Sequence, residues 1–124
     1  MSNIKTFREL EVWKKAHELV LQVYKITKAF PKEELFVLVS QLGRAAISIA
    51  ANIVEGFRRK TLKDSVNFYH MADASLEELK YHLLLGRDLG YMDVPDYEKI
   101  HLLCEEVGKL LTRWIQSQER YLKS

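Results

Sequence analysis

The sequence has few residues that cross-link a chain or interrupt a helix. Its 124 residues include one cysteine, Cys104, two prolines and five glycines. A single cysteine cannot form a disulfide within the chain, which excludes a disulfide-stapled secreted fold. Cys104 lies in an apolar pattern of helical spacing, so we expect a buried thiol in a reducing compartment. The scarcity of proline and glycine allows long helices.

Long apolar runs are also missing. The longest stretch without a charged residue is Ala45 to Val54, ten residues, which is about half the length of a membrane-spanning helix. Near the start of the chain, Lys5, Arg8 and Glu9 break up the apolar core that a signal peptide needs. We therefore expect a cytoplasmic protein with no membrane association.

The motifs of common catalytic and metal sites are absent. No glycine-rich phosphate loop, His-Glu-x-x-His motif or cysteine pair occurs, which argues against nucleotide-binding, zinc-protease and redox functions. A di-iron site in a helical bundle needs Glu-x-x-His on two helices, and only Glu98 with His101 has this spacing. We instead expect His101 to be partly exposed beside an apolar seam. The sequence predicts a protein that is not an enzyme and has no metal or cofactor.

Apolar residues at helical spacing dominate the chain. Stripes with alternating spacing of three and four residues mark helices at about 8–28, 32–57, 62–89 and 94–121. No segment alternates with period two long enough for a strand. The short links cannot return along the length of a helix, so successive helices run antiparallel. We predict one all-α domain over residues 1–124, an antiparallel up-down-up-down four-helix bundle.

Local signals mark the expected helix ends. Pro31 suits a first helical turn and predicts that the second helix begins at the next residue. Thr61 followed by Asp64 is a capping signal for the third helix. Asp93 with Asp96 marks the start of the fourth.

The segment from Ser40 to Gly56 is almost entirely apolar, yet its few polar residues keep helical register. They are Gln41, Arg44, Ser48, Asn52 and Glu55. This spacing places them on one face of the second helix. With Ser75 and Glu78 of the third segment they are predicted to form a structural polar network, because buried polar groups need partners. A solvent-facing stripe, or acid–base chemistry by Glu55 and Glu78, is the alternative.

Three apolar positions of the second helix lie outside its main apolar stripe. With Ile47, Ala51 and Val54, the helix has too little polar surface to expose one whole face to solvent. We therefore expect this helix to be buried on more than one face. Contact with further copies of the chain would supply the extra burial.

Charge is distributed unevenly along the chain. Residues 1–63 hold 12 Lys and Arg against 6 Asp and Glu, a balance of +6, and residues 64–124 hold 7 against 11, a balance of −4, which together give the net +2. The asymmetry fits complementary packing of helices or subunits. It also fits a basic edge that contacts a phosphate backbone.

The densest group of cations follows Phe57, at the expected turn between the second and third helices. We call Arg58, Arg59, Lys60 and Lys63 the basic cluster. One interpretation is a solvated turn, in which the positive charge is favourable because it lies beside the negative C-terminal end of the second helix. The other is a contact with phosphate groups. No base-reading motif accompanies it, so only non-specific or shape-dependent binding of RNA or DNA is supported.

The apolar second segment carries a resemblance to a known family. RAAISIAANIVEG, residues 44–56, together with residues 30–34 (FPKEE) and 72–79 (ADASLEEL), resembles small four-helix-bundle proteins encoded in intervening sequences of bacterial 23S ribosomal RNA genes. The likeness runs from about Phe7 to Tyr121. The chain differs from the usual family pattern at three positions. A basic or polar residue is common in the family at the position of Gly43, a proline at that of Ala50, and a glycine at that of Ala74.

The resemblance implies an antiparallel four-helix bundle that assembles into a ring-like homopentamer, with an unsettled function suspected to involve nucleic acid. A related branch, the accessory variability proteins of diversity-generating retroelements, has a similar fold and serves a reverse transcriptase and its RNA. We therefore expect a non-enzymatic oligomer that binds RNA, DNA or a nucleoprotein partner, such as a ribosomal component, through the basic cluster. The alternative is a protein-interaction scaffold, such as an accessory subunit of a reverse transcriptase, without direct nucleic-acid contact.

Overall fold

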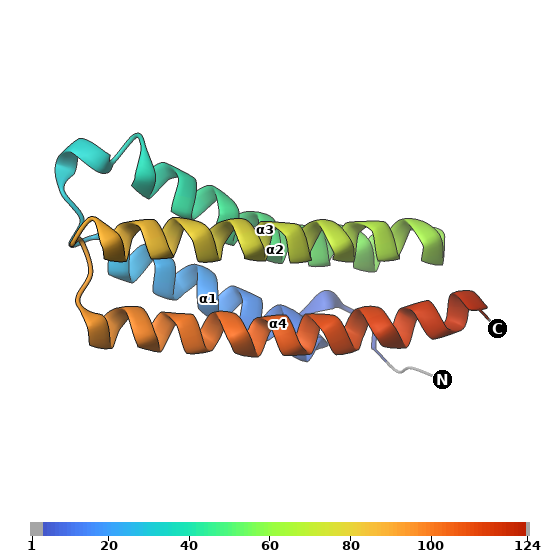
Figure 1. The fold of residues 1–124 in the computed structure, drawn as a ribbon. Coiled ribbons are helices and arrows are strands. Elements are labelled where there is room, and N and C mark those ends of the chain that lie inside the picture. Colours follow the sequence, from blue (N-terminus) through green and yellow to red (C-terminus); the bar gives the residue numbers. More distant parts are fainter. Residues whose placement is uncertain (1–3, 124) are drawn as a thin grey trace.

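The computed structural model describes residues 4–123 and is built of helices alone in this range (Figure 1). The elements are η1 (Phe7–Glu9), α1 (Glu11–Thr27), η2 (Lys32–Glu34), α2 (Leu38–Arg58), α3 (Leu62–Asp88) and α4 (Val94–Lys123). Figure 1 shows that consecutive long helices run in opposite directions. Each packs against two neighbours, so that α1 contacts α2 and α4, and α3 contacts the same two helices. The predicted all-α four-helix fold is confirmed.

The core runs along the axis of the bundle and takes side chains from all four helices. Leu19, Leu42, Leu79 and Leu111 are fully buried, one from each helix. Burying a side chain of this size contributes about 1.5–3 kcal/mol. Cys104 is also fully buried, and burial raises the pKa of its thiol to about 12. The predicted buried thiol is thus confirmed.

Two of the predicted helix starts have the expected capping contacts. The Thr61 hydroxyl accepts a hydrogen bond from the backbone N–H of Asp64 at 3.2 Å, at the start of α3. The Asp93 carboxylate accepts one from the backbone N–H of Asp96 at 2.9 Å, at the start of α4. Both contacts satisfy an N–H group that the helix itself leaves without a partner.

The start of α2 differs from the expectation. The helix begins at Leu38, whereas residues 32–34 form only the turn η2. Next to this start, the Glu34 carboxylate accepts hydrogen bonds from the backbone N–H of Leu38 at 3.3 Å and from the Tyr91 hydroxyl at 2.8 Å. Glu34 thereby caps α2 from outside the helix and ties its start to the link before α4. The first helix also begins later than expected, at Glu11, after η1.

At the opposite end of α2 the backbone comes very close to α3. A Cβ atom added at Gly56 would lie 2.5 Å from Cε1 of Tyr69 and 3.0 Å from the backbone oxygen of Ser65. Tyr69 is the largest fully buried side chain of the protein as described. Glycine is therefore required at position 56, and the close approach fixes where the turn after α2 lies.

Candidate nucleic-acid interface

The structure places the basic cluster in the short turn between α2 and α3. Arg58 is the last residue of α2, Arg59 and Lys60 lie in the turn, and Lys63 is in the first turn of α3. All four side chains are exposed. The Thr61 cap holds the turn at the start of α3, so the four cations are carried on a short, anchored connection.

Among the residues that the structure describes, only one member of the basic cluster is held by other side chains. The Arg59 guanidinium lies 4.9 Å from the centre of the Phe68 ring and 3.8 Å from the Glu55 carboxylate. Arg58, Lys60 and Lys63 form no ion pair within residues 4–123. The exposed pair of Arg59 with Glu55 contributes little to stability. The positive charge of the basic cluster is therefore available for an anionic partner.

The structure brings three residues of the predicted polar network together. The hydroxyls of Ser48 in α2 and Ser75 in α3 lie 2.7 Å apart. The Asn52 amide donates to the backbone oxygen of Ser48 at 2.9 Å and to its hydroxyl at 3.1 Å. All three side chains are half-buried. This contact ties α2 to α3 through small residues.

The other four members of that predicted set lie outside this contact. Gln41 and Arg44 are exposed. Glu55 of α2 pairs with Arg59, in the turn that follows this helix. Glu78 lies 3.4 Å from His82, one turn further along α3. These two glutamate side chains are 56% and 55% exposed. Their exposure places them in water rather than in a buried pair suited to acid–base chemistry.

The outer face of α2 is not covered within one chain. Ile47 is 45% exposed, Ala51 is exposed, and Val54 is half-buried. The expectation that α2 is buried on more than one face is therefore not met by the single chain. These apolar positions form an open surface on the outside of the bundle.

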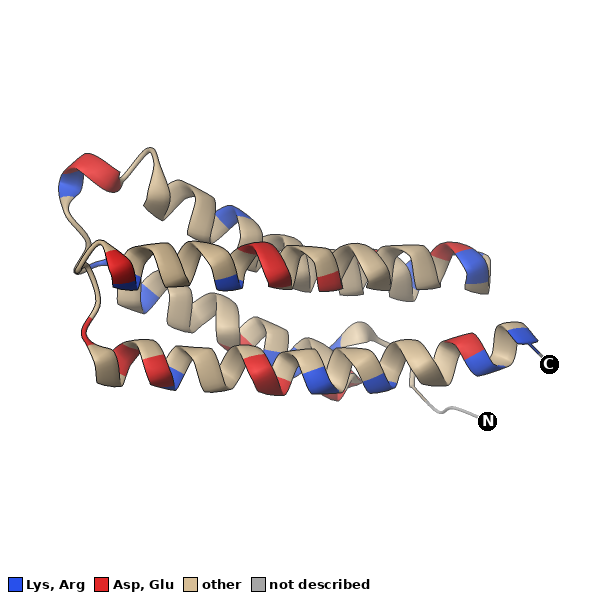
Figure 2. Ribbon diagram, viewed as in Figure 1, with Lys and Arg blue, Asp and Glu red and all other residues tan. Residues whose placement is uncertain are grey.

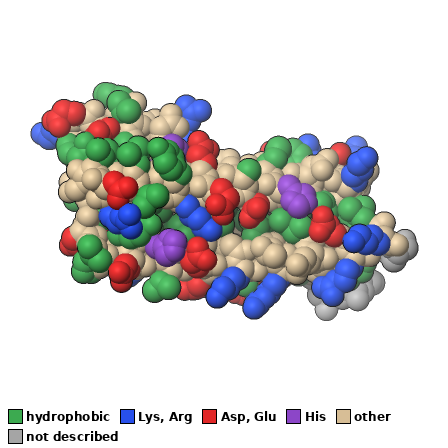
Figure 3. Space-filling model, in the orientation of Figure 1, with side chains coloured by type: hydrophobic (Ala, Val, Ile, Leu, Met, Phe, Trp, Pro, Cys, Tyr) green, Lys and Arg blue, Asp and Glu red, His purple; other side chains and the backbone are tan. Residues whose placement is uncertain are grey.

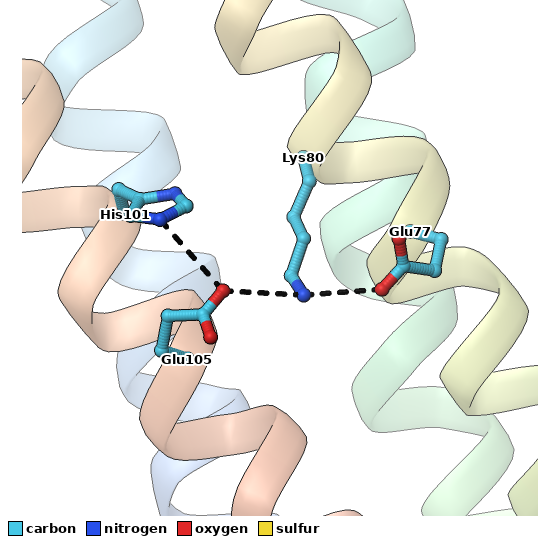
Figure 4. A network of polar contacts seen from close by, with 4 residues as sticks. All are labelled: Glu77, Lys80, His101 and Glu105. Carbon is cyan, nitrogen blue, oxygen red and sulfur yellow. Dashed lines mark hydrogen bonds and ion pairs between the residues drawn. The ribbon is translucent and has the colours of Figure 1, made fainter.

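The structure contains a polar network between α3 and α4 (Figure 4), which the sequence analysis did not predict. The Lys80 ammonium lies 3.0 Å from Glu77 and 3.4 Å from Glu105, and His101 lies 3.7 Å from the same Glu105 carboxylate. Burial works to lower the pKa of Lys80, but the hydrogen bonds and charges of the two glutamates outweigh it and raise the pKa. The network keeps Lys80 charged and engaged.

This network also fixes the environment of His101. Its side chain is 44% exposed, and its ring stacks on Tyr97 with centroids 5.7 Å apart. The prediction of a partly exposed histidine beside the apolar seam is confirmed. Within residues 4–123, no group of three or more His, Cys, Asp or Glu side chains is placed to hold a metal ion.

One ion pair joins the basic first half of the chain to the acidic second half among the described residues. Lys15 of α1 lies 3.2 Å from Glu106 of α4, and the hydrogen bond to Glu106 helps to raise the pKa of Lys15. Within one chain, ion pairs between the two halves thus account for little of the charge asymmetry. None of the described helices has the length and hydropathy that a membrane span requires.

Comparisons with known proteins agree with this architecture. A solved structure from Bacteroides thetaiotaomicron VPI-5482, a protein with unknown function from the S23 ribosomal protein family, is similar with a TM-score of 0.79 and 29% sequence identity. The similarity covers 85% of this chain and 95% of that chain. No curated protein matches. A family model described as 23S rRNA-intervening sequence protein matches residues 8–113, and the chain therefore belongs to the 23S rRNA-intervening sequence protein family.

Proposed function

We propose that this protein is a non-enzymatic, oligomeric RNA-binding protein that contacts phosphates through the basic cluster. The observation that carries the proposal is the turn between α2 and α3, where Arg58, Lys60 and Lys63 are exposed and have no carboxylate partner in the described chain. Unpaired cations at one end of a rigid bundle attract a phosphate backbone and release its counterions. Membership of a family described by 23S rRNA intervening sequences supports RNA as the nucleic acid.

Self-association would multiply this weak contact. The exposed apolar positions on the outer face of α2, Ile47 at 45% and Ala51, suit an interface between copies of the chain. The resemblance noted above implies a pentameric ring. Several basic clusters on one assembly bind one RNA with much greater avidity than a single cluster does.

A charge-reversal experiment tests RNA binding. In one variant Arg58, Arg59, Lys60 and Lys63 are changed to Glu. In a matched control Lys25, Lys28, Lys32 and Lys99 are changed to Glu, four exposed lysines at the opposite end of the bundle. Both variants have the same net charge. We expect the first to lose affinity for structured ribosomal RNA at about 50 mM salt and the control to keep most of it.

Fluorescence anisotropy with labelled RNA measures both affinities, and circular dichroism checks that both variants remain helical. Equal affinities of the two variants would contradict a contact at the basic cluster. The absence of measurable binding by the unchanged protein under the same conditions would defeat the RNA-binding function itself.

The oligomer is tested separately by Ile47→Glu. Because Ile47 is exposed in the single chain, the change should leave the helices intact and reduce the particle mass to that of one chain. Light scattering at micromolar concentration measures the mass. Tyr81→Glu is the control, at a hydrophobic residue on α3 that is more exposed than Ile47, at 59% against 45%. A single-chain mass for the unchanged protein contradicts self-association.

A protein-interaction scaffold is the second candidate, and a different region favours it. Leu35, Phe36 and Val37, in the link before α2, are 53%, 88% and 61% exposed. Three consecutive exposed apolar side chains suit contact with a protein surface. In this alternative the partner is a reverse transcriptase or a ribosomal component, and the chain makes no direct contact with RNA.

A further inference from the structure

A cleft of about 540 Å³ lies at the end of the bundle that carries the basic cluster. Four aromatic residues from three helices line it. They are Phe57 of α2, Tyr69 of α3, and Trp114 and Tyr121 of α4. Its volume falls within the range of about 300–1,000 Å³ that is usual for small-ligand sites. The basic cluster begins at the residue that follows Phe57.

The inner wall of the cleft is formed by packed aromatic side chains. The rings of Tyr69 and Trp114 meet edge to face with centroids 5.9 Å apart. Tyr69 is fixed by its close approach to Gly56, and burial raises the pKa of its hydroxyl, which therefore stays protonated. Tyr121 is 69% exposed and stands at the open side of the cleft. The aromatic surface is thus part of the folded bundle and needs no rearrangement to form.

Polar groups beside the aromatic wall offer hydrogen bonds. Ser117 donates to the backbone oxygen of Trp114 at 2.7 Å, and the Gln118 amide donates to the Ser117 hydroxyl at 3.2 Å. The amide oxygen of Gln118 has no donor among the described residues. The indole N–H of Trp114 is buried next to the Tyr69 hydroxyl, and this contact works against the rise in the pKa of Tyr69.

Cationic residues are close in sequence to several residues that line the cleft. In the basic cluster, Arg58 directly follows Phe57, and Lys63 is two positions before Ser65, another lining residue. In the last turns of α4, the exposed Arg120 and Lys123 flank Tyr121. Figure 2 marks Lys and Arg positions on the ribbon at the start of α3 and the end of α4, and Figure 3 shows Lys and Arg side chains at the same end of the molecule.

We propose that the cleft binds an unpaired base of single-stranded RNA, stacked on its aromatic side chains, while the basic cluster and the end of α4 hold the flanking phosphates. The proposal rests on the proposed RNA-binding function and names the part of the RNA that is recognised. Proteins recognise RNA most often at unpaired bases, which stack on aromatic rings and hydrogen-bond at their edges. Stacking tolerates any base because every base has a π-face.

A base that stacks in the cleft should raise affinity beyond what phosphates alone provide. Replacing a stacking aromatic residue typically lowers affinity by about 5- to 100-fold for each base. An RNA chain without bases carries the same phosphates and lacks only the stacking groups. The comparison of the two ligands therefore separates base binding from phosphate binding.

The experiment uses oligouridylate of twelve nucleotides and a fully abasic oligomer of the same length and charge. Because the chain has two tryptophans, Trp13→Phe leaves Trp114 as the only indole reporter. We expect the oligouridylate to quench Trp114 emission and to bind about 5- to 100-fold more tightly than the abasic oligomer. Circular dichroism checks the fold of this variant, and anisotropy of labelled oligomers with the unchanged protein gives the same affinity ratio independently.

A second variant tests the cleft without altering the core. Tyr121→Ala should weaken binding of the oligouridylate and leave that of the abasic oligomer unchanged. Tyr81→Ala, at a tyrosine that is 59% exposed elsewhere on α3, should change neither. Equal affinity for both oligomers without a change in Trp114 emission would overturn base binding and leave phosphate binding intact. Failure of both oligomers to bind at about 50 mM salt would overturn the RNA-binding function together with this proposal.

Discussion

The two ends of the bundle are closed in different ways. At one end α2 and α3 are joined by a tight turn that is anchored by the Thr61 cap and by the close approach of Gly56 to Tyr69. At the other end, two longer links are tied to each other by the Glu34 carboxylate, which joins the start of α2 to Tyr91. Figure 1 shows these closures at opposite ends of the molecule.

The two ends also differ in how their exposed groups are arranged. At the end that carries the turn between α2 and α3, called the tight end, Arg58, Lys60 and Lys63 lie close together in sequence and have no carboxylate partner within residues 4–123. The other end exposes lysines that are spread over several elements, together with apolar side chains, of which Phe36 is 88% accessible. Cations without partners favour an anion, and exposed aromatic groups favour a protein surface. The proposed RNA contact therefore lies at the tight end, and the proposed protein contact of the alternative lies at the other end.

A substitution at Gly56 should give the largest change in stability and should affect the tight end. Gly56→Ala places a Cβ atom 2.5 Å from the buried Tyr69 ring. Overpacking of this kind costs up to about 3 kcal/mol, and the gain in helix propensity returns about 1 kcal/mol, so we expect a net loss of about 2 kcal/mol. Urea unfolding measures the change.

Gly43→Ala is the matched control on the same helix. Its Cβ atom would lie 3.8 Å from the Tyr24 hydroxyl, at ordinary contact distance. Helix propensity should then dominate and stabilise the protein by about 0.5–1 kcal/mol. The same sign of change for both variants would show that the two parts of α2 do not differ in packing as described.

A smaller change is expected at the other end, for Glu34→Ala. The variant removes the acceptor of the Leu38 N–H and of the Tyr91 hydroxyl. Because one donor belongs to a helix N-terminus and the acceptor is charged, we expect a loss of about 1–2 kcal/mol in the free energy of unfolding. Thermal or urea unfolding measures it.

Glu33→Ala, at the exposed neighbouring residue, is the control and should change stability by less than about 0.5 kcal/mol. A similar effect of the two substitutions would mean that Glu34 does not close this end. RNA affinity should be unchanged in both variants, because the basic cluster lies at the opposite end of the bundle.

Sequence patterns predicted those parts of the fold that depend on neighbouring residues. Thr61 and Asp93 cap helices through N–H groups only three residues away, so their roles can be read from the sequence. The start of α2 could not be read in this way, because Glu34 finds its partner Tyr91 on a distant link. The same limit hid the pairing of Lys80 in α3 with Glu105 in α4.

The candidate site was predicted only in part. The basic cluster is visible as a run of cations in the sequence, and the structure adds that three of its members have no ion-pair partner within residues 4–123. Tyr69 and Trp114 fall in apolar stripes, where a pattern cannot distinguish a core aromatic residue from one that lines a cleft. Glu55 and Glu78 were predicted to join Ser48 and Ser75 in one polar network. In the structure both glutamates are exposed and lie outside the contact between the two serines. Each instead pairs with a residue four positions further along the chain, Arg59 or His82.

The salt dependence of RNA affinity tests the phosphate contact most directly. We predict that log K for single-stranded RNA falls against log salt with a slope of about −2 to −3 for each engaged basic cluster, since each phosphate neutralised contributes about 0.7. Changing Arg58, Arg59, Lys60 and Lys63 to Ala should remove that share of the slope, and changing Lys25, Lys28, Lys32 and Lys99 to Ala should leave it. A slope near zero in the unchanged protein, or an unchanged slope in the first variant, would contradict the assignment of RNA to the tight end.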